Sequence, residues 1–204
     1  GEKNTAIGYN AMEANTTADN NVAVGAQALQ ANTTGTNNTA VGFDALNDNV
    51  TTSGNTAIGK QSLSKNIAAN NTSVGYLSLV ENTTGANNVA VGFEALQENT
   101  TGASNTAVGS ESLDANTTGS DNVAMGRHAL GGNTTGVQNT ALGKSSLFSN
   151  TTARNNIAVG FEGAKLNTTG TRIIAIGANA YDASDTENDN LAIGYQAMTT
   201  NTAG

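Results

Sequence analysis

Carboxylate side chains are the groups in this sequence that could act as catalytic acids and bases. A glycosidase needs two carboxyls about 5–9 Å apart, one of them with a raised pKa. The acids that could form such a pair sit at variable positions of different sequence repeats: Glu13, Asp44, Glu94, Glu111 and Glu162. Neighbouring repeats could supply the separation, but nothing in the sequence marks one pair above the others. We therefore expect a solvated surface with no catalytic residue and no enzyme activity, and keep a polysaccharide-cleaving tail spike as the enzyme alternative.

His128 and one acidic turn are the candidates for metal ligation. His128 is the single histidine, and no acid or thiol recurs beside it, so we expect a surface residue. Four acids crowd the turn of the eleventh repeat: Asp182, Asp185, Glu187 and Asp189. Oxygen ligands at alternating positions can bind Ca²⁺, but the absence of a glycine-centred loop favours a hydrated turn, and Ca²⁺ binding stays an alternative. Without cysteine there is neither a disulfide nor a thiolate metal site. We expect no metal and no cofactor.

Adjacent threonines recur in register near the end of most repeats. These pairs are Thr16/Thr17, Thr33/Thr34, Thr83/Thr84, Thr100/Thr101, Thr117/Thr118 and Thr134/Thr135. A flat threonine array could bind ice, but neighbouring residues of a strand point to opposite faces, and these pairs lie in turns. Ice binding is therefore a minor alternative. Asn-Thr-Thr also matches an N-glycosylation acceptor, which we interpret as turn chemistry.

All of these residues belong to a repeat that runs through the whole sequence. The phrase Asn, small or β-branched residue, Ala, branched aliphatic residue, Gly starts at residues 4, 21, 38, 55, 71, 88, 105, 122, 139, 156, 173 and 190, with Ile173 in place of the eleventh Asn. The interval is 17 residues except for one of 16, between Asn55 and Asn71. Such a period predicts a solenoid in which each unit is buried against its neighbours. We treat residues 1–204 as a single β-roll repeat domain and as a segment of a longer fibrous protein.

Each repeat predicts one flat coil of an all-β parallel roll. In the repeat over 88–104, NVAVGFEALQENTTGAS, the first half is β-branched and bounded by Asn and Gly, as in a short strand. Gly92 has a counterpart in every repeat, which indicates a corner with positive φ or close backbone approach. The segment over 93–98 carries a recurring leucine and is interpreted as a second short strand, with a helix as the alternative. Asn-Thr-Thr-Gly closes the coil as a turn, and its asparagines are expected to stack as a ladder.

Two irregularities fall within this pattern. The missing residue after Asn66 should be absorbed in a turn, because a lost strand residue would reverse the facing of that coil. Gly163-Ala164-Lys165-Leu166, followed by Ile173 and Tyr181, departs from the consensus and predicts a local bulge near the end of the roll.

The strand residues also predict self-association. Alternation places the alanine column (the residues before the branched aliphatic) and the aliphatic column on opposite faces. Because both columns are small or apolar, we expect both to be covered: the aliphatic side inside the coil, and the alanine side against another copy. A unit this narrow should bury little surface alone, which also predicts a cyclic homo-oligomer.

Charge and hydropathy exclude several partners. The net charge is −8, with only scattered basic residues, which disfavours nucleic acid. No apolar run approaches the length of a membrane span, so we expect no membrane contact within this segment.

The phrases NTAIG and NVAVG, followed by xxAL and an Asn/Gly turn, resemble the head repeats of trimeric autotransporter adhesins of the Yersinia adhesin type. Similar repeats occur in phage tail fibres. The resemblance covers residues 4–204 and implies a left-handed parallel β-roll joined as a homotrimer. It also implies an extracellular rod on a bacterial cell surface that attaches to a host or surface receptor, such as a matrix protein or a glycan, or else a virion tail fibre or tail spike. The 17-residue repeat is longer than the familiar one, and no coiled-coil stalk, neck or translocator is present.

Overall fold

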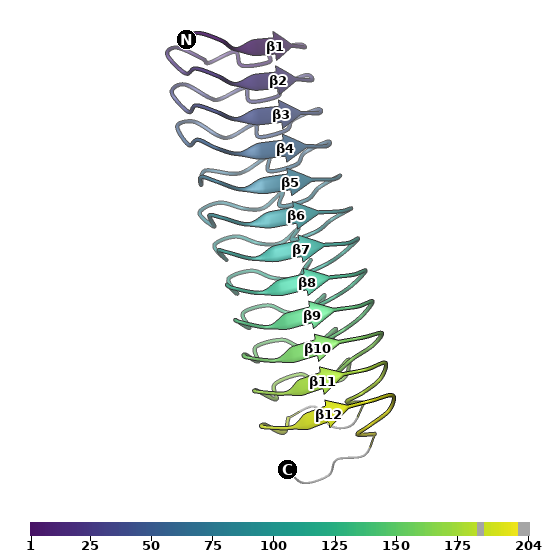
Figure 1. Cartoon of the computed structure of the whole chain (residues 1–204). Helices are drawn as coiled ribbons and strands as arrows, with labels where there is room; N and C mark the ends of the chain where they lie inside the picture. Colours follow the sequence, from purple (N-terminus) through teal and green to yellow (C-terminus); the bar gives the residue numbers. More distant parts are fainter. Residues whose placement is uncertain (183–185, 200–204) are drawn as a thin grey trace.

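Twelve parallel strands stacked in chain order form one sheet along a slightly curved rod (Figure 1). The computed structural model describes residues 1–182 and 186–199. The strands are β1 (Thr5–Ile7), β2 (Val22–Val24), β3 (Thr39–Val41), β4 (Thr56–Ile58), β5 (Thr72–Val74), β6 (Val89–Val91), β7 (Thr106–Val108), β8 (Val123–Met125), β9 (Thr140–Leu142), β10 (Ile157–Val159), β11 (Ile174–Ile176) and β12 (Leu191–Ile193). The described residues include no helix, and hence no helical membrane span. The predicted all-β parallel solenoid is confirmed.

Strand register is continuous along the rod, because each strand residue pairs with its equivalent in the next repeat. The partners are 17 residues apart, as in Thr39↔Thr56 of β3 and β4. The short repeat keeps this register, with Thr56↔Thr72 at a spacing of 16. The deletion lies in the turn, where Asn66 Nδ2 donates to the carbonyl two residues ahead rather than three. The prediction that a turn absorbs the deletion is confirmed.

Each strand ends at the glycine corner that the sequence predicted. These glycines have positive φ, for example 142° at Gly92 and 137° at Gly109. A Cβ built on Gly92 would lie 2.5 Å from the carbonyl oxygen of Gly109 in the next coil. Both expected reasons for glycine, positive φ and close backbone approach, therefore apply at the same residue.

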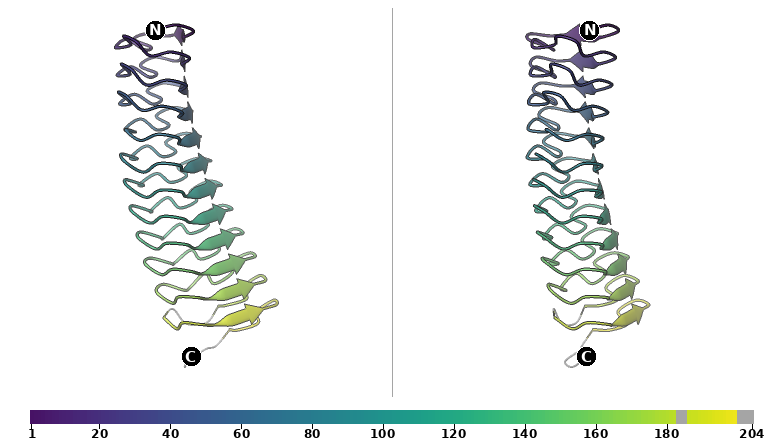
Figure 2. Two further views of the ribbon diagram at one scale, coloured as in Figure 1. Left: turned by 60° about the vertical axis from the view of Figure 1, so that its left-hand side comes forward. Right: turned by 90° about the vertical axis from the view of Figure 1, so that its left-hand side faces the viewer.

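The second half of each coil is a chain of turns, so the predicted second strand is wrong. Two of its positions have a left-handed backbone, represented by Glu94 and Leu96, each with φ 53°. A left-handed residue interrupts an extended pleat, and L-residues adopt it at an energetic cost. Hydrogen bonds between coils hold this segment in both directions: Glu94 N–H donates to the Tyr76 carbonyl, and Leu96 N–H donates to the Ser112 carbonyl. Figure 2 shows the sheet on one side of the rod and these turns on the other.

The facing of the strands is the reverse of the sequence prediction. Ala90 and Ala107 are fully buried and form the coil interior with Leu96 and Leu113. The branched aliphatics Val91 and Val108 point outward and are half-buried or exposed. The buried strand alanines pack against the buried leucines of the turn segment, so small strand side chains and large turn side chains together fill the interior. The alanine column therefore fills the core, and the aliphatic column is left outside.

Two columns of buried asparagine lie at the edge of the coil opposite the glycine corner. In the leading column, Asn105 Oδ1 accepts from the backbone N–H of Asn122, 3.0 Å away, while Asn105 Nδ2 donates to the Gly119 carbonyl. In the turn column, Asn116 Nδ2 donates both to Asn99 Oδ1 of the preceding coil, at 2.8 Å, and to the Gly119 carbonyl. The expected asparagine ladder is confirmed, and it satisfies backbone groups as well as side-chain amides.

Core substitutions occur as matched sets. Ser73 replaces the strand alanine, and its hydroxyl binds those of Ser62 and Ser78, so that the three buried hydroxyls satisfy one another. Near the C-terminal end, the small Ala164 takes the leucine position, and the large Tyr181 takes the same position one coil later. Strands β10 to β12 pass this region in unbroken register. The predicted bulge is therefore absent from the strands, and the irregular residues change the packing of the core instead.

Replacing one amide of the turn ladder tests the role of this column. Asn116→Ala removes the donor to Asn99 and the acceptor of Asn133. We expect the free energy of unfolding to fall by about 2–4 kcal/mol, because buried polar groups lose their partners. Urea denaturation followed by circular dichroism measures this change. The exposed neighbour Thr118→Ala is the matched control and should change stability by less than about 0.5 kcal/mol; equal effects would show that the ladder does not hold the coils together.

Candidate interaction surface

The outer sheet face runs through all twelve strands of the rod. It consists of the first and third residues of strands β1 to β12. The first positions are Thr5, Val22, Thr39, Thr56, Thr72, Val89, Thr106, Val123, Thr140, Ile157, Ile174 and Leu191. The third positions are Ile7, Val24, Val41, Ile58, Val74, Val91, Val108, Met125, Leu142, Val159, Ile176 and Ile193. None of these strand residues is charged. A sheet face open to water normally carries polar side chains, so this composition is typical of a covered face.

The outer sheet face is somewhat smaller than one side of a standard protein–protein interface. Twelve strands about 4.8 Å apart span roughly 53 Å, and three residues give a width of about 10 Å. The flat area of about 500 Å², with its flanking side chains, approaches the roughly 800 Å² that each partner buries in a standard interface. Apolar patches of this size on single chains are often functional.

The single chain buries enough surface to form a core of its own. The chain exposes 8188 Å², whereas a globular monomer of this mass exposes about 8,800 Å². A single coil stack therefore buries as much surface as an ordinary domain. The expectation that a narrow unit buries little surface alone is wrong, and the homo-oligomer stays a prediction. Any drive to associate comes instead from the chemistry of the outer sheet face.

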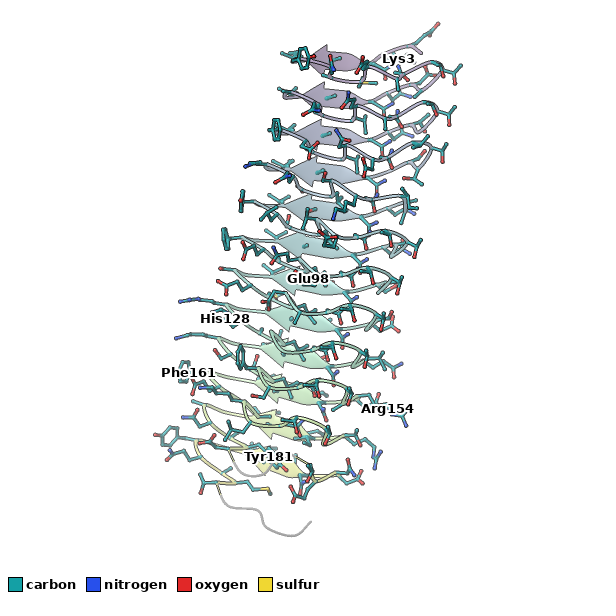
Figure 3. All side chains as sticks on the ribbon, turned by 180° about the vertical axis from the view of Figure 1, so that it is seen from behind. Lys3, Glu98, His128, Arg154, Phe161 and Tyr181 are labelled. Carbon is teal, nitrogen blue, oxygen red and sulfur yellow. The ribbon has the colours of Figure 1, made fainter. Side chains whose placement is uncertain are left out.

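An aromatic and basic column borders the outer sheet face at the glycine corner. Its members are Tyr9, Phe43, Lys60, Tyr76, Phe93, Arg127, Lys144, Phe161 and Tyr195. Tyr76 and Phe93 stack with centroids 5.6 Å apart. The Lys60 ammonium lies 5.6 Å from the Tyr76 ring centre, a cation–π contact. Tyr76 therefore contacts the column members of both neighbouring coils. In Figure 3, Phe161 and His128 lie at this edge, and Arg154 lies at the opposite one.

The structure places the candidate catalytic acids on the turn side, in contact with polar neighbours. Glu13 accepts from Gln30 Nε2 at 2.7 Å, Asp44 accepts from Ser64 Oγ at 3.1 Å, and Glu162 pairs with Lys165 at 3.0 Å. Glu94 and Glu111 occupy the same left-handed position of their coils. The described residues enclose no pocket around any of them.

His128 lies in a small cluster that the sequence did not suggest. Its Nδ1 is 3.2 Å from Glu111 Oε2, and its ring meets the Phe148 ring edge-on at 6.0 Å. Asp114 belongs to the same cluster, and its buried Oδ1 has no hydrogen-bond partner among the described residues. A Cβ on Gly131 would lie 3.1 Å from Asp114 Oδ1 and 3.2 Å from the Phe148 ring. Because Gly131 has no side chain, the Phe148 ring and the Asp114 carboxyl can both lie close to its backbone.

Burial raises the pKa of Asp114 from 3.8 to about 6. Loss of hydration is the largest cause, and the neighbouring Glu111 carboxylate raises the pKa further. Hydrogen bonding with the backbone at Asp114 and Ala115 and the charge of His128 lower it. The sequence does contain a signal for this site. Gly131, followed by Gly132, occupies the position equivalent to Asp114 in the next repeat, where most other repeats carry a larger side chain.

The acidic turn of the eleventh repeat does not gather its carboxylates within the part that is described. Asp189 pairs with Arg172 of the preceding coil, with Asp189 Oδ2 2.7 Å from Arg172 Nη2. This ion pair lowers the pKa of Asp189, chiefly through the hydrogen bond. Asp182 and Glu187 are half-buried, and Asp185 lies outside the described residues. No group of three or more acid or histidine side chains suited to a metal ion is found over 1–182 and 186–199.

The paired threonines play two different parts. The first hydroxyl is engaged between coils, as where Thr100 Oγ1 donates to the Thr117 carbonyl at 3.0 Å. The second threonine, such as Thr101 or Thr118, is exposed. The exposed threonines therefore form one column of single residues, and not the flat double array that the ice-binding alternative needs. The acceptor asparagines of Asn-Thr-Thr, such as Asn99 and Asn116, are fully buried and hydrogen-bonded, which places them beyond the reach of a modifying enzyme in the folded chain.

No protein-family model, curated protein or solved structure matches this chain with significant similarity.

Replacing Asp114 tests the buried carboxyl. The pKa of Asp114 is higher in the folded chain than in the unfolded chain, so the unfolded chain releases the proton at lower pH. The free energy of unfolding therefore falls as the pH rises from about 4 to 6. We expect Asp114→Asn to raise the free energy of unfolding at pH 7 by on the order of 1 kcal/mol after solvent screening, and to change it little at pH 4. Thermal unfolding at both pH values measures the difference. The exposed Asp48→Asn is the control, and a gain that is the same at both pH values would count against the assignment.

Proposed function

We propose that this chain is a rigid segment of an extracellular fibre whose copies associate through the outer sheet face as a homotrimer. The observation that carries the proposal is the absence of any charged residue from the strands over the full length of the rod. Another copy of the chain is the occupant that best fits this face, because it has the same length, the same composition and the same spacing between side-chain rows. Threefold cyclic symmetry would repeat one heterologous contact between each chain and the next around the axis.

The turn side is then left to meet a receptor. Ten of the repeat-borne acids lie on this side: Glu13, Asp44, Asp48, Glu81, Glu94, Glu98, Glu111, Asp114, Glu162 and Asp182. Glu98, for example, lies near the middle of the turn side in Figure 3. Repeated shallow contacts from three chains would give adhesion by multivalency rather than through a single pocket. A cell-surface adhesin is the function that we favour, and a phage tail fibre uses the same geometry.

Charged substitutions on the outer sheet face test self-association. We expect the parent protein to sediment at three times the 20.4 kDa of one chain. Val91→Glu with Val108→Glu should dissociate it to single chains with an unchanged circular dichroism spectrum, because buried, unpaired carboxylates oppose association.

The matched control places the same charges in the same two coils on the exposed turn column, as Thr101→Glu with Thr118→Glu. This variant should keep the parent mass. A parent protein that stays a monomer at all concentrations would refute the assembly. Binding to immobilised matrix proteins and glycans should weaken in the dissociated variant through loss of valency, whereas release of sugar ends from a polysaccharide would favour the tail-spike enzyme.

A further inference from the structure

The outer sheet face is not uniform along the rod. Over β1 to β9 the first strand position is Thr or Val, with Thr in six of the nine strands. Over β10 to β12 it becomes Ile157, Ile174 and Leu191, and the third position holds Val159, Ile176 and Ile193. We name these six side chains the C-terminal aliphatic patch.

Exposure follows the same division. The first strand position is half-buried from β2 to β9 but exposed at Ile157 and Ile174, at 41% and 37%. Both residues lie inside the stack, so their exposure is not the effect of an end coil. The larger side chains project further from the sheet and keep more apolar area in water.

We infer that the C-terminal aliphatic patch is the dominant contact between copies and favours their parallel, coil-to-coil alignment. This inference rests on the proposed self-association. Its physical basis is the apolar area removed from water, which is greatest per coil where Ile and Leu replace Thr. The Thr-rich coils contribute less and follow the alignment that the patch imposes.

Threefold symmetry makes the copies of a trimer parallel, and the same gradient favours parallel over antiparallel contact between any two copies. In a parallel pair the patch meets itself, and Thr39 or Thr56 meets another threonine, which can be its hydrogen-bond partner. In an antiparallel pair, β11 would face β2 and β10 would face β3, so that Thr39 would be buried against aliphatic side chains. An unpaired hydroxyl buried in this way is costly. The parallel arrangement avoids that cost and gathers the largest side chains together.

Substitution to threonine tests the patch with little risk to folding, because six other coils already carry threonine at this position. The test variant is Ile157→Thr with Ile174→Thr, and the matched control is Val22→Thr with Val89→Thr. Sedimentation over a dilution series measures the concentration at which half of the assemblies dissociate. We expect the test variant to raise this concentration at least tenfold more than the control. Equal shifts in the two variants would overturn the inference while leaving self-association intact, whereas a parent chain that never associates would refute the proposed function itself.

Cross-linking tests the alignment independently of affinity, because the chain has no cysteine of its own. Ile176→Cys is prepared alone and mixed with Val24→Cys, and disulfide-linked pairs are identified by mass after mild oxidation. Parallel copies should give links between two Ile176→Cys chains. Links confined to Ile176→Cys with Val24→Cys, the positions that antiparallel copies would oppose, would contradict the inference.

Discussion

Two columns of buried asparagine are the constraint on which the rest of this structure depends. An asparagine that is buried in every coil needs partners for its amide, and the neighbouring coil supplies them at 2.8–3.0 Å. Unmet buried amides are costly, so each coil must lie directly above the last, with no slip along the rod. The glycine corner fits this spacing, because a Cβ at that corner would collide with the next backbone. The asparagine columns at one edge and the glycines at the other thus fix both ends of every strand.

This fixed width explains which residues lie inside. The interior of each regular coil holds one small residue from the strand, usually alanine, and one leucine from the turn segment together with the buried Ala or Ser that precedes it. Where the core departs from this pattern, neighbouring core residues change as well, as with Ser62, Ser73 and Ser78 or with Ala164 followed by Tyr181. The branched aliphatics are consequently displaced to the outer sheet face. The apolar surface proposed for self-association is therefore a direct consequence of a core too thin to hold it.

Much of this architecture could be predicted from the sequence. The 17-residue period, the strand before each glycine, the asparagine ladder and the deletion near Asn66 all follow from spacing and turn chemistry. The facing of the strands could not be derived from alternation, which separates Ala107 from Val108 without saying which is inside. The decisive signal was size: the alanine column tolerates only serine, whereas the other column varies from Val to Met and Leu. The turn segment was also misjudged, because a left-handed backbone at residues such as Leu96 leaves no mark in composition. Asp114 was missed because its environment comes from Gly131 and Phe148, one and two coils away.

Enlarging one residue on each side of a single strand tests the facing most directly, whatever the oligomeric state. The exterior position already accepts larger side chains, Met125 and Leu142, so Val108→Leu should change the free energy of unfolding by less than about 1 kcal/mol. Ala107 is fully buried, so Ala107→Leu should overpack the coil and lower the free energy of unfolding by about 3 kcal/mol or prevent folding. Urea denaturation of the two variants decides the matter. A tolerated Ala107→Leu beside a strongly destabilising Val108→Leu would contradict this account.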